Sequence, residues 1–102
     1  MRKAAVFING TKAAELIEHN SKSYELNYEQ NYQGLAISLT LPVKRKPFTF
    51  NQFPTFFEGV LPEGMMLDSL LRTRKIDKDD YFSQLMAVGM DLVGHVTVEE
   101  IK

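Results

Sequence analysis

The chain has 102 residues, enough for one domain built around a single hydrophobic core. Its 12 Lys and Arg residues against 13 Asp and Glu residues give a net charge of −1, which argues against generic binding to nucleic acid or to anionic membranes. Because the sequence holds no cysteine, it excludes disulfides, thiolate catalysis and cysteine-based zinc sites, and a cytoplasmic setting is the expectation.

The first part of the chain predicts antiparallel strands. Residues 4–8 form a short apolar run that stops at Asn9-Gly10, a dipeptide typical of tight hairpins because both positions tolerate positive φ. The returning strand is expected over 12–18 and a second turn over 20–22. Residues 24–28 alternate between apolar and polar side chains, which predicts a half-buried strand.

The most regular alternation in the sequence predicts a strand over residues 35–41, ended by Pro42. The side chains expected to share one face of this strand are Leu35, Ile37, Leu39 and Leu41. A basic loop, Lys44-Arg45-Lys46-Pro47, follows it. Phe48 and Phe50 then indicate a last short strand before the composition changes.

The second half of the chain predicts helices. Asn51 is the expected cap of a short helical turn, and leucines at helical spacing predict a helix over 66–75. Asp77 is the expected N-cap of a third helix, and Gly89 suits the left-handed position that follows a helix.

A final strand over residues 96–101 completes the predicted elements. Strands followed by helices and a strand predict an α+β domain spanning residues 1–102. The expected architecture is a small antiparallel β-sheet or partly closed barrel with two to three short helices. No apolar run reaches the roughly 20 residues that a membrane-spanning helix needs.

The pattern of polar residues does not favour catalysis. Glu58 and Glu63 could form an acid/base pair, but Glu63 after a proline is better explained as a helix-start carboxylate or as a hydrogen-bonding group for a partner. Residues without metal-ligand spacing are His19, His95, Asp77, Asp79 and Asp80. We therefore expect a protein that is not an enzyme and that binds no metal or cofactor.

An unusually apolar turn lies between the predicted short helical turn and the helix over 66–75. Phe56-Phe57-Glu58-Gly59-Val60-Leu61-Pro62-Glu63-Gly64 leads directly into Met65 and Met66. This turn either packs back on the core or presents itself to a partner, and methionine suits both roles because its side chain is flexible and polarizable. The candidate partner-binding residues are Phe57, Glu58, Leu61, Pro62, Glu63, Gly64, Met65 and Met66.

Four ordered motifs resemble the N-terminal subdomain of HipA-like serine/threonine kinases, the toxins of bacterial toxin–antitoxin systems. They are Val6-Phe7-Ile8-Asn9-Gly10, the strands around Tyr24–Tyr28 and Ile37–Pro42, the turn Phe56–Gly64, and Leu85–Gly94. The chain departs from the family pattern at three places. Gly59 stands where asparagine is usual, Met65-Met66-Leu67 where an arginine is common, and His95 where a small residue is usual.

The resemblance also implies a role. A freestanding form of this subdomain occurs in tripartite HipBST-type systems, where the small protein HipS is the antitoxin of a shortened kinase, HipT. On this resemblance the chain would lack the kinase's catalytic residues. It would bind a HipT-like kinase at or near the active site, in a ternary complex with a HipB-like helix-turn-helix protein, without touching nucleic acid or membrane itself.

Two other functions stay open at this point. The first is a non-inhibitory structural subunit that completes a split HipA-like kinase. The second, less favoured, is an independent enzyme or small-molecule binder.

Overall fold

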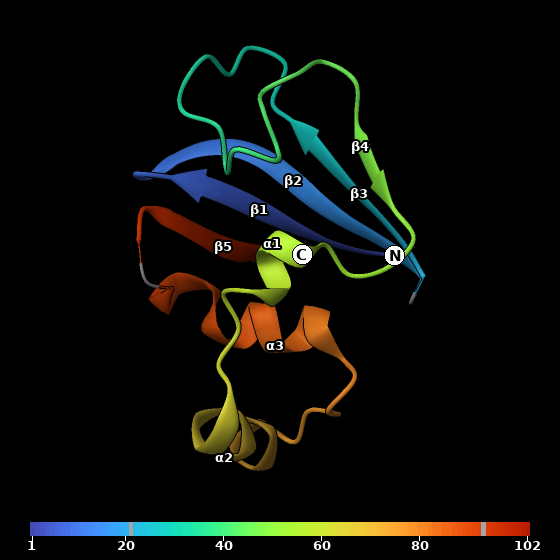
Figure 1. The fold of residues 1–102 in the computed structure, drawn as a ribbon, viewed down its shortest axis with the longest axis vertical. Coiled ribbons are helices and arrows are strands. Elements are labelled where there is room, and N and C mark those ends of the chain that lie inside the picture. Colours follow the sequence, from blue (N-terminus) through green and yellow to red (C-terminus); the bar gives the residue numbers. More distant parts are fainter. Residues whose placement is uncertain (21, 93) are drawn as a thin grey trace.

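The computed structural model describes residues 1–20, 22–92 and 94–102 and has an α+β fold, as predicted (Figure 1). The elements are β1 (Arg2–Ile8), β2 (Thr11–Asn20), β3 (Ser23–Tyr28), β4 (Phe48–Phe50), α1 (Thr55–Glu58), α2 (Gly64–Arg74), α3 (Tyr81–Val88), a short 3-10 helix η1 (Gly89–Asp91) and β5 (Val96–Ile101). The predicted turn over 20–22 includes Ser21, and the predicted connection before the last strand includes Val93. These two residues lie outside the described ranges.

One antiparallel sheet carries the five strands in the order β4-β3-β2-β1-β5. The predicted hairpin at Asn9-Gly10 is confirmed, because both residues have positive φ, 50° and 85°, and β1 pairs with β2 across them. The strands predicted over 4–8, 12–18 and 24–28 are confirmed within a few residues. β5 returns from the helical region to lie beside β1, with Val98 opposite Val6.

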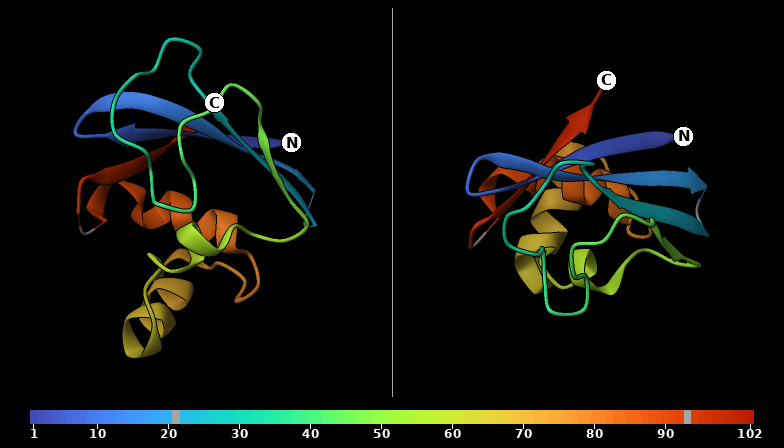
Figure 2. Two further views of the ribbon diagram at one scale, coloured as in Figure 1. Left: turned by 45° about the horizontal axis from the view of Figure 1, so that its top comes forward. Right: turned by 90° about the horizontal axis from the view of Figure 1, so that it is seen from above.

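The core lies between the sheet and helices α1 and α3. Side chains of the core with no exposed surface include Val6, Leu16, Leu26 and Val98 from the strands, and Phe57, Phe82 and Leu85 from the helices. Complete burial of one such side chain stabilises the fold by about 1.5–3 kcal/mol. Helix α2 extends away from this core in all three ribbon views (Figures 1 and 2).

The strand predicted over residues 35–41 is wrong. This segment belongs to the long loop between β3 and β4, which folds back toward α1 (Figures 1 and 2). The four apolar side chains do not share a face. Ile37 and Leu41 are buried, whereas Leu35 is 62% exposed and Leu39 is fully exposed at 101%.

The hydroxyl of Tyr28 explains why this segment is a loop. It accepts a hydrogen bond from the backbone N–H of Ile37 at 2.9 Å and donates one to the backbone C=O of Leu41. A tight turn closes between these contacts, where the N–H of Leu41 donates to the C=O of Ser38 at 3.1 Å. Backbone groups that a sheet strand would offer to its neighbours are therefore used locally.

The cap of α3 also differs from the prediction, because it is Asp80 and not Asp77. The Asp80 carboxylate accepts hydrogen bonds from the backbone N–H of Ser83 at 3.1 Å and from its hydroxyl at 2.7 Å. Asp77 contributes its backbone carbonyl instead, which accepts from the N–H of Asp80 at 3.0 Å. Similarly, Pro54 and not Asn51 occupies the cap position of α1.

Gly89 was predicted as a left-handed residue, but its φ of −56° lies in the right-handed helical region. The structure gives a different reason for glycine here. A Cβ atom at this position would lie 2.2 Å from the backbone oxygen of Val98 in β5. The close approach of η1 to the edge of the sheet therefore requires a residue without a side chain.

A polar network fastens α3 to the sheet. Arg2 in β1 forms an ion pair with Glu18 in β2 at 2.6 Å and a second with Asp80 at 3.0 Å, and it donates to the hydroxyl of Ser83 at 2.8 Å. The Tyr24 hydroxyl donates to Glu18 at 3.1 Å. Burial and the contact with Glu18 raise the pKa of Tyr24 to about 12, since both favour the neutral phenol.

Asp80→Ala is expected to lower the free energy of unfolding by about 0.5–2 kcal/mol, the usual cost of losing a helix N-cap. Burial would raise the pKa of Asp80, but the hydrogen bonds from Ser83 and Arg2 outweigh it and leave that pKa below its ordinary value. The stabilisation from Asp80 is therefore present above about pH 4 and is lost as the pH falls through the lowered pKa. Urea unfolding of both proteins across this range measures the difference.

Asp77→Ala is the matched control for this prediction. It removes a carboxylate three residues earlier that makes none of the capping contacts, so its effect should stay within about 0.5 kcal/mol. A larger loss for Asp77→Ala than for Asp80→Ala would contradict the assigned cap.

Gly89→Ala is expected to lower the free energy of unfolding by about 1–3 kcal/mol, because the new methyl group must displace η1 from β5. Gly59→Ala provides the comparison, since Gly59 has a φ of −66° and a Cβ there would stand 3.4 Å from the nearest backbone oxygen atoms. Its unfolding free energy should change by less than about 0.5 kcal/mol. If both variants lost the same free energy of unfolding, the close approach of Gly89 to Val98 would not explain the glycine.

Candidate partner-binding surface

Helix α2 is a regular element without a buried residue. Its leucines, Leu67, Leu70 and Leu71, are half-buried, and its outer surface faces solvent. Helices in globular proteins normally gain their stability by burying one face against the core. Helix α2 therefore leaves much of its surface exposed.

The turn before α2 is anchored in the core. Phe57 is completely buried and Leu61 is 9% exposed. The backbone between them is tied by hydrogen bonds from Val60 N–H to Phe57 C=O at 3.3 Å and from Leu61 N–H to Glu58 C=O at 3.2 Å. Phe57 and Leu61 therefore position the turn, and neither side chain is presented to a partner.

Gly64 sets the direction in which α2 leaves the turn. Its φ of +60° is a left-handed conformation that costs other residues about 1–2 kcal/mol. Glu63 before it is extended, exposed and at the N-cap position of α2, and its backbone carbonyl accepts from the N–H of Leu67 at 3.4 Å. Pro62 is half-buried beside them.

The methionines that follow are held out in solvent, where Met65 is 87% exposed and Met66 is 74% exposed. The candidate residues thus divide into a buried pair, the half-buried Pro62, and an exposed group that comprises Glu58, Glu63, Gly64, Met65 and Met66. The aromatic half of the turn therefore packs on the core, and the methionine half faces solvent, where contact with a partner stays a prediction.

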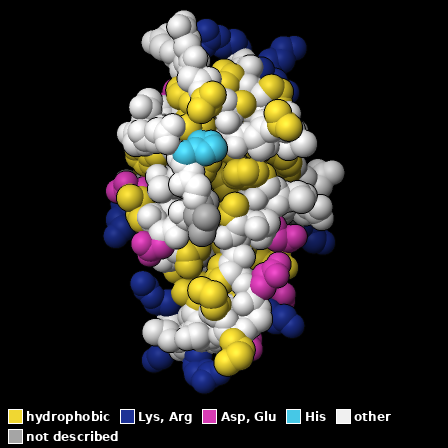
Figure 3. Space-filling view, turned by 60° about the vertical axis from the view of Figure 1, so that its left-hand side comes forward, with side chains coloured by type: hydrophobic (Ala, Val, Ile, Leu, Met, Phe, Trp, Pro, Cys, Tyr) yellow, Lys and Arg dark blue, Asp and Glu magenta, His cyan; other side chains and the backbone are white. Residues whose placement is uncertain are grey.

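A second exposed apolar group was not anticipated, because its residues were assigned to a strand. It comprises Leu35 and Leu39 in the loop between β3 and β4. Leu39 lines a hollow of 570 Å³ together with Phe50 in β4 and Thr55 and Phe56 in α1. Figure 3 shows apolar side chains spread over the upper, middle and lower parts of one face, with Lys and Arg side chains mainly around its outline.

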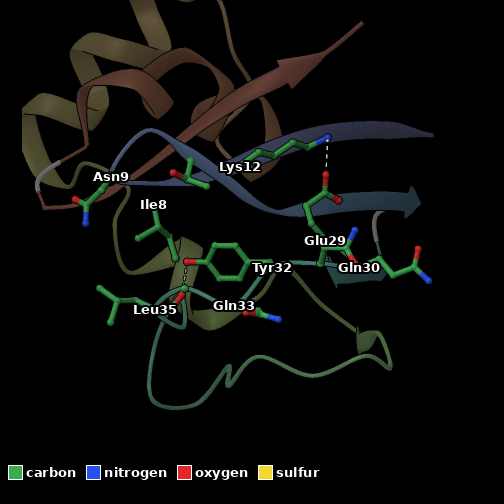
Figure 4. Close-up of a pocket in the computed structure, with 11 residues that line it drawn as sticks. Ile8, Asn9, Lys12, Glu29, Gln30, Tyr32, Gln33 and Leu35 are labelled. Atoms are coloured by element: carbon green, nitrogen blue, oxygen red, sulfur yellow. Dashed lines mark hydrogen bonds and ion pairs between the residues drawn. The ribbon is translucent and has the colours of Figure 1, made fainter.

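A groove of 810 Å³ with both polar and apolar lining residues lies between the β1–β2 hairpin and the loop after β3 (Figure 4). Lys12 is paired there with Glu29 at 3.3 Å and with Glu15 at 2.7 Å, and these contacts raise the pKa of Lys12. The Tyr32 hydroxyl donates to the backbone C=O of Leu35 at 2.6 Å. The charged groups of this groove neutralise one another, so it suits hydrogen bonding and offers no activated nucleophile.

Metal binding has no support in the described part of the chain, residues 1–20, 22–92 and 94–102. No group of three or more His, Asp or Glu side chains there could hold a metal ion. His19 instead lies 3.0 Å from Glu25, and this contact, together with one from Asn27, lowers the pKa of Glu25. Over the same residues, no helix is both long enough and apolar enough to cross a membrane.

Comparison with known proteins identifies the fold. A family model described as "HipA N-terminal domain" matches residues 4–99. A solved structure described as "N-terminal domain of HipA toxin" is similar with a TM-score of 0.78 and 24% sequence identity, and the match covers 100% of this chain and 94% of that chain. The family model also agrees with the resemblance read from the sequence motifs.

Two curated relatives are similar in sequence. An uncharacterized protein of Haemophilus influenzae is 28% identical over 102 residues, which cover 100% of this chain and 95% of that protein. The serine/threonine-protein kinase toxin HipA of Shewanella oneidensis is 29% identical over 76 residues, 72% of this chain and 17% of the kinase. The chain therefore corresponds to a small part of that kinase and to nearly all of the H. influenzae protein.

Tyr28→Phe is expected to lower the free energy of unfolding by about 1–3 kcal/mol, because it leaves the buried N–H of Ile37 and C=O of Leu41 without their partner. Hydrogen exchange at the Ile37 amide should accelerate. Tyr32→Phe is the matched variant, since the hydroxyl of Tyr32 bonds to an exposed carbonyl, and it should cost less. Unchanged exchange at Ile37 in Tyr28→Phe would disprove the role given to this hydroxyl.

Proposed function

The chain belongs to the HipA N-terminal domain family, and we propose that it is an antitoxin that binds and neutralises a HipA-like serine/threonine kinase. The observation that carries the proposal is the exposed pair Met65 and Met66 on α2, a helix without a buried residue. In the S. oneidensis kinase the matching region is joined to a much longer chain. A surface that meets the kinase body within one polypeptide can also bind it as a separate protein.

The geometry of the turn favours tight binding. Its backbone is fixed by core contacts at Phe57 and Leu61, so little conformational entropy is lost when a partner docks. Methionine side chains adapt to the shape of a pocket, and a few such side chains can supply most of the binding energy. We expect the complex to bury about 1,200–2,000 Å² in total.

Neutralisation would follow from where the turn binds. We propose that the turn between Leu61 and Met66, with Leu61 as its buried anchor, enters the kinase at or near its active site, and that Met65 and Met66 contact the cleft. The exposed carboxylate of Glu63 then supplies a hydrogen-bond acceptor at the same place. A rigid apolar tip in the cleft blocks access of substrate.

The chain acts without catalytic activity of its own, in the cytoplasm. A HipB-like helix-turn-helix protein joins it and the kinase in a ternary complex, so that contact with DNA passes through that protein. The net charge of −1 supports this assignment, since nucleic-acid-binding domains are usually basic.

A second candidate function uses the same surface without inhibition. The matching region of S. oneidensis HipA is part of a protein named as a kinase, so the domain is compatible with an assembled kinase. The chain would then complete a split HipA-like kinase as a structural subunit. Co-expression separates the two, because an antitoxin restores growth to cells that express the kinase, whereas a completing subunit increases phosphorylation of the kinase's substrates.

Met65→Asp with Met66→Asp is expected to weaken binding to the kinase by about a hundredfold and to abolish growth rescue, because two charges enter an apolar contact. Both side chains are exposed, so thermal unfolding should change little. The partner to test is a HipA-like kinase encoded beside this chain, with binding measured by calorimetry.

Met90→Asp is the control, because it makes the same kind of substitution, with one added carboxylate, at an exposed methionine outside α1 and α2. It should bind and rescue as the wild type does. Full rescue by the Met65, Met66 double variant would refute the role of the α2 tip, and a gene neighbourhood without such a kinase would count against the proposed partner.

A further inference from the structure

The turn from Ser38 to Leu41 holds one exposed leucine, Leu39, in a fixed position. Its ends are buried through Ile37 and Leu41, which are 4% and 5% exposed, and both are hydrogen-bonded to the Tyr28 hydroxyl. The hydroxyls of Ser38 and Thr40 lie 3.0 Å apart across the turn. Leu39 at its tip nevertheless has its whole side chain in solvent. Such a preorganised apolar tip loses little entropy when it is covered.

A hollow beside the tip can receive an apolar side chain. Its 570 Å³ lie between the turn and the start of α1, and the lining includes Leu41, Phe50, Pro54 and Phe56. Leu39 stands at its rim, so a partner residue that enters the hollow also contacts Leu39. This arrangement of a knob next to a hole is typical of interface hot spots.

The charged side chains of the loop that carries the tip have one sign. Between Glu29 and Glu58 the sequence contains no Asp or Glu, and the charged side chains there are Lys44, Arg45 and Lys46. Lys44 stacks over the ring of Phe48, with its Nζ 3.9 Å from the ring centroid. Arg45 and Lys46 are exposed, and neither has a salt bridge to another residue in the described ranges. This end of the molecule therefore attracts negative charge.

We propose that Leu35, Leu39, Arg45 and Lys46, named here the Leu39 patch, dock an acidic segment of a protein partner that inserts an apolar side chain into the neighbouring hollow. The positive charge of Arg45 and Lys46 favours acidic residues on either side of the inserted side chain. The apolar lining of the hollow favours an apolar residue as the inserted side chain. Electrostatic complementarity of this kind sets specificity and speeds association. The patch is distinct from the α2 methionines, and its assignment does not depend on the kinase.

Other anionic partners fit the patch less well. Two unpaired cations neutralise few phosphates, and an exposed leucine gains nothing from a sugar-phosphate backbone. An anionic membrane surface needs a longer apolar face or more basic residues for stable attachment than one leucine tip and a short basic run supply. A protein segment uses the leucine, the hollow and the charge together.

The test is an NMR titration of the isotopically labelled chain with two short synthetic peptides that share one leucine pattern. One peptide carries Asp and Glu flanks and the other carries Lys flanks. The acidic peptide should shift the amide signals of residues 35–46 and bind at least about tenfold more tightly than the basic one. Arg45→Glu with Lys46→Glu should reverse this preference, since it inverts the charge but keeps the leucine and the hollow.

Leu39→Asp should weaken binding of the acidic peptide by about tenfold or more, and Leu39→Ser should do so without adding charge. Met65→Asp with Met66→Asp should leave it unchanged. Equal binding of both peptides, shifts confined to α2, or tighter binding at these residues to phosphatidylserine vesicles or single-stranded DNA would overturn the proposal. Because no kinase is present, each of these results leaves the antitoxin proposal untouched.

Discussion

The structure depends on covering one face of a five-stranded sheet with very short helices. Phe57 from α1 and Phe82 and Leu85 from α3 fill that face and are completely buried. Because α1 has only four residues and α3 eight, each places its fully buried aromatic side chain at the sheet. Helix α2 is consequently left outside the core, and this exclusion makes its surface free to bind. The same packing that stabilises the domain thus creates its candidate binding surface.

Polar contacts fix the positions of helix α3 and of the loop between β3 and β4, which apolar packing alone does not determine. Arg2 joins the first strand to the cap of α3, so the helix is held at one end by the ion pair between Arg2 and Asp80 and at the other by the close contact of Gly89 with Val98. The hydroxyl of Tyr28 does the same for the loop between β3 and β4. In each case a single group connects segments that are distant in the sequence. These connections give the Leu39 turn and helix α3 defined orientations relative to the sheet.

Local sequence pattern predicted the parts of the fold that local chemistry determines. The Asn9-Gly10 hairpin, the strand at Tyr24–Tyr28 and the last strand follow from turn residues and alternation. The segment 35–41 alternates equally well, but Tyr28 supplies its hydrogen bonds from a distant position, which no local pattern reveals. Asp77 and Asp80 are both residue types that cap helices, and the hydrogen bond from the backbone N–H of Ser83 to the Asp80 carboxylate identifies Asp80 as the cap. The exposure of Met65 and Met66 was undecidable for a related reason, because the leucine spacing of α2 is compatible with a buried or an exposed helix.

The pairing of the last strand with the first has a consequence for how the domain is made. Lys3 in β1 lies opposite Ile101 in β5, so the contact joins residues from the two ends of the chain and has a high sequence separation. Contacts of this kind form late, because a long loop must close before they add stability. During synthesis on the ribosome, β1 keeps one edge unpaired and Phe82 stays under an incomplete sheet until residues 96–101 have emerged. The domain therefore completes its sheet only after nearly all of its residues have been translated.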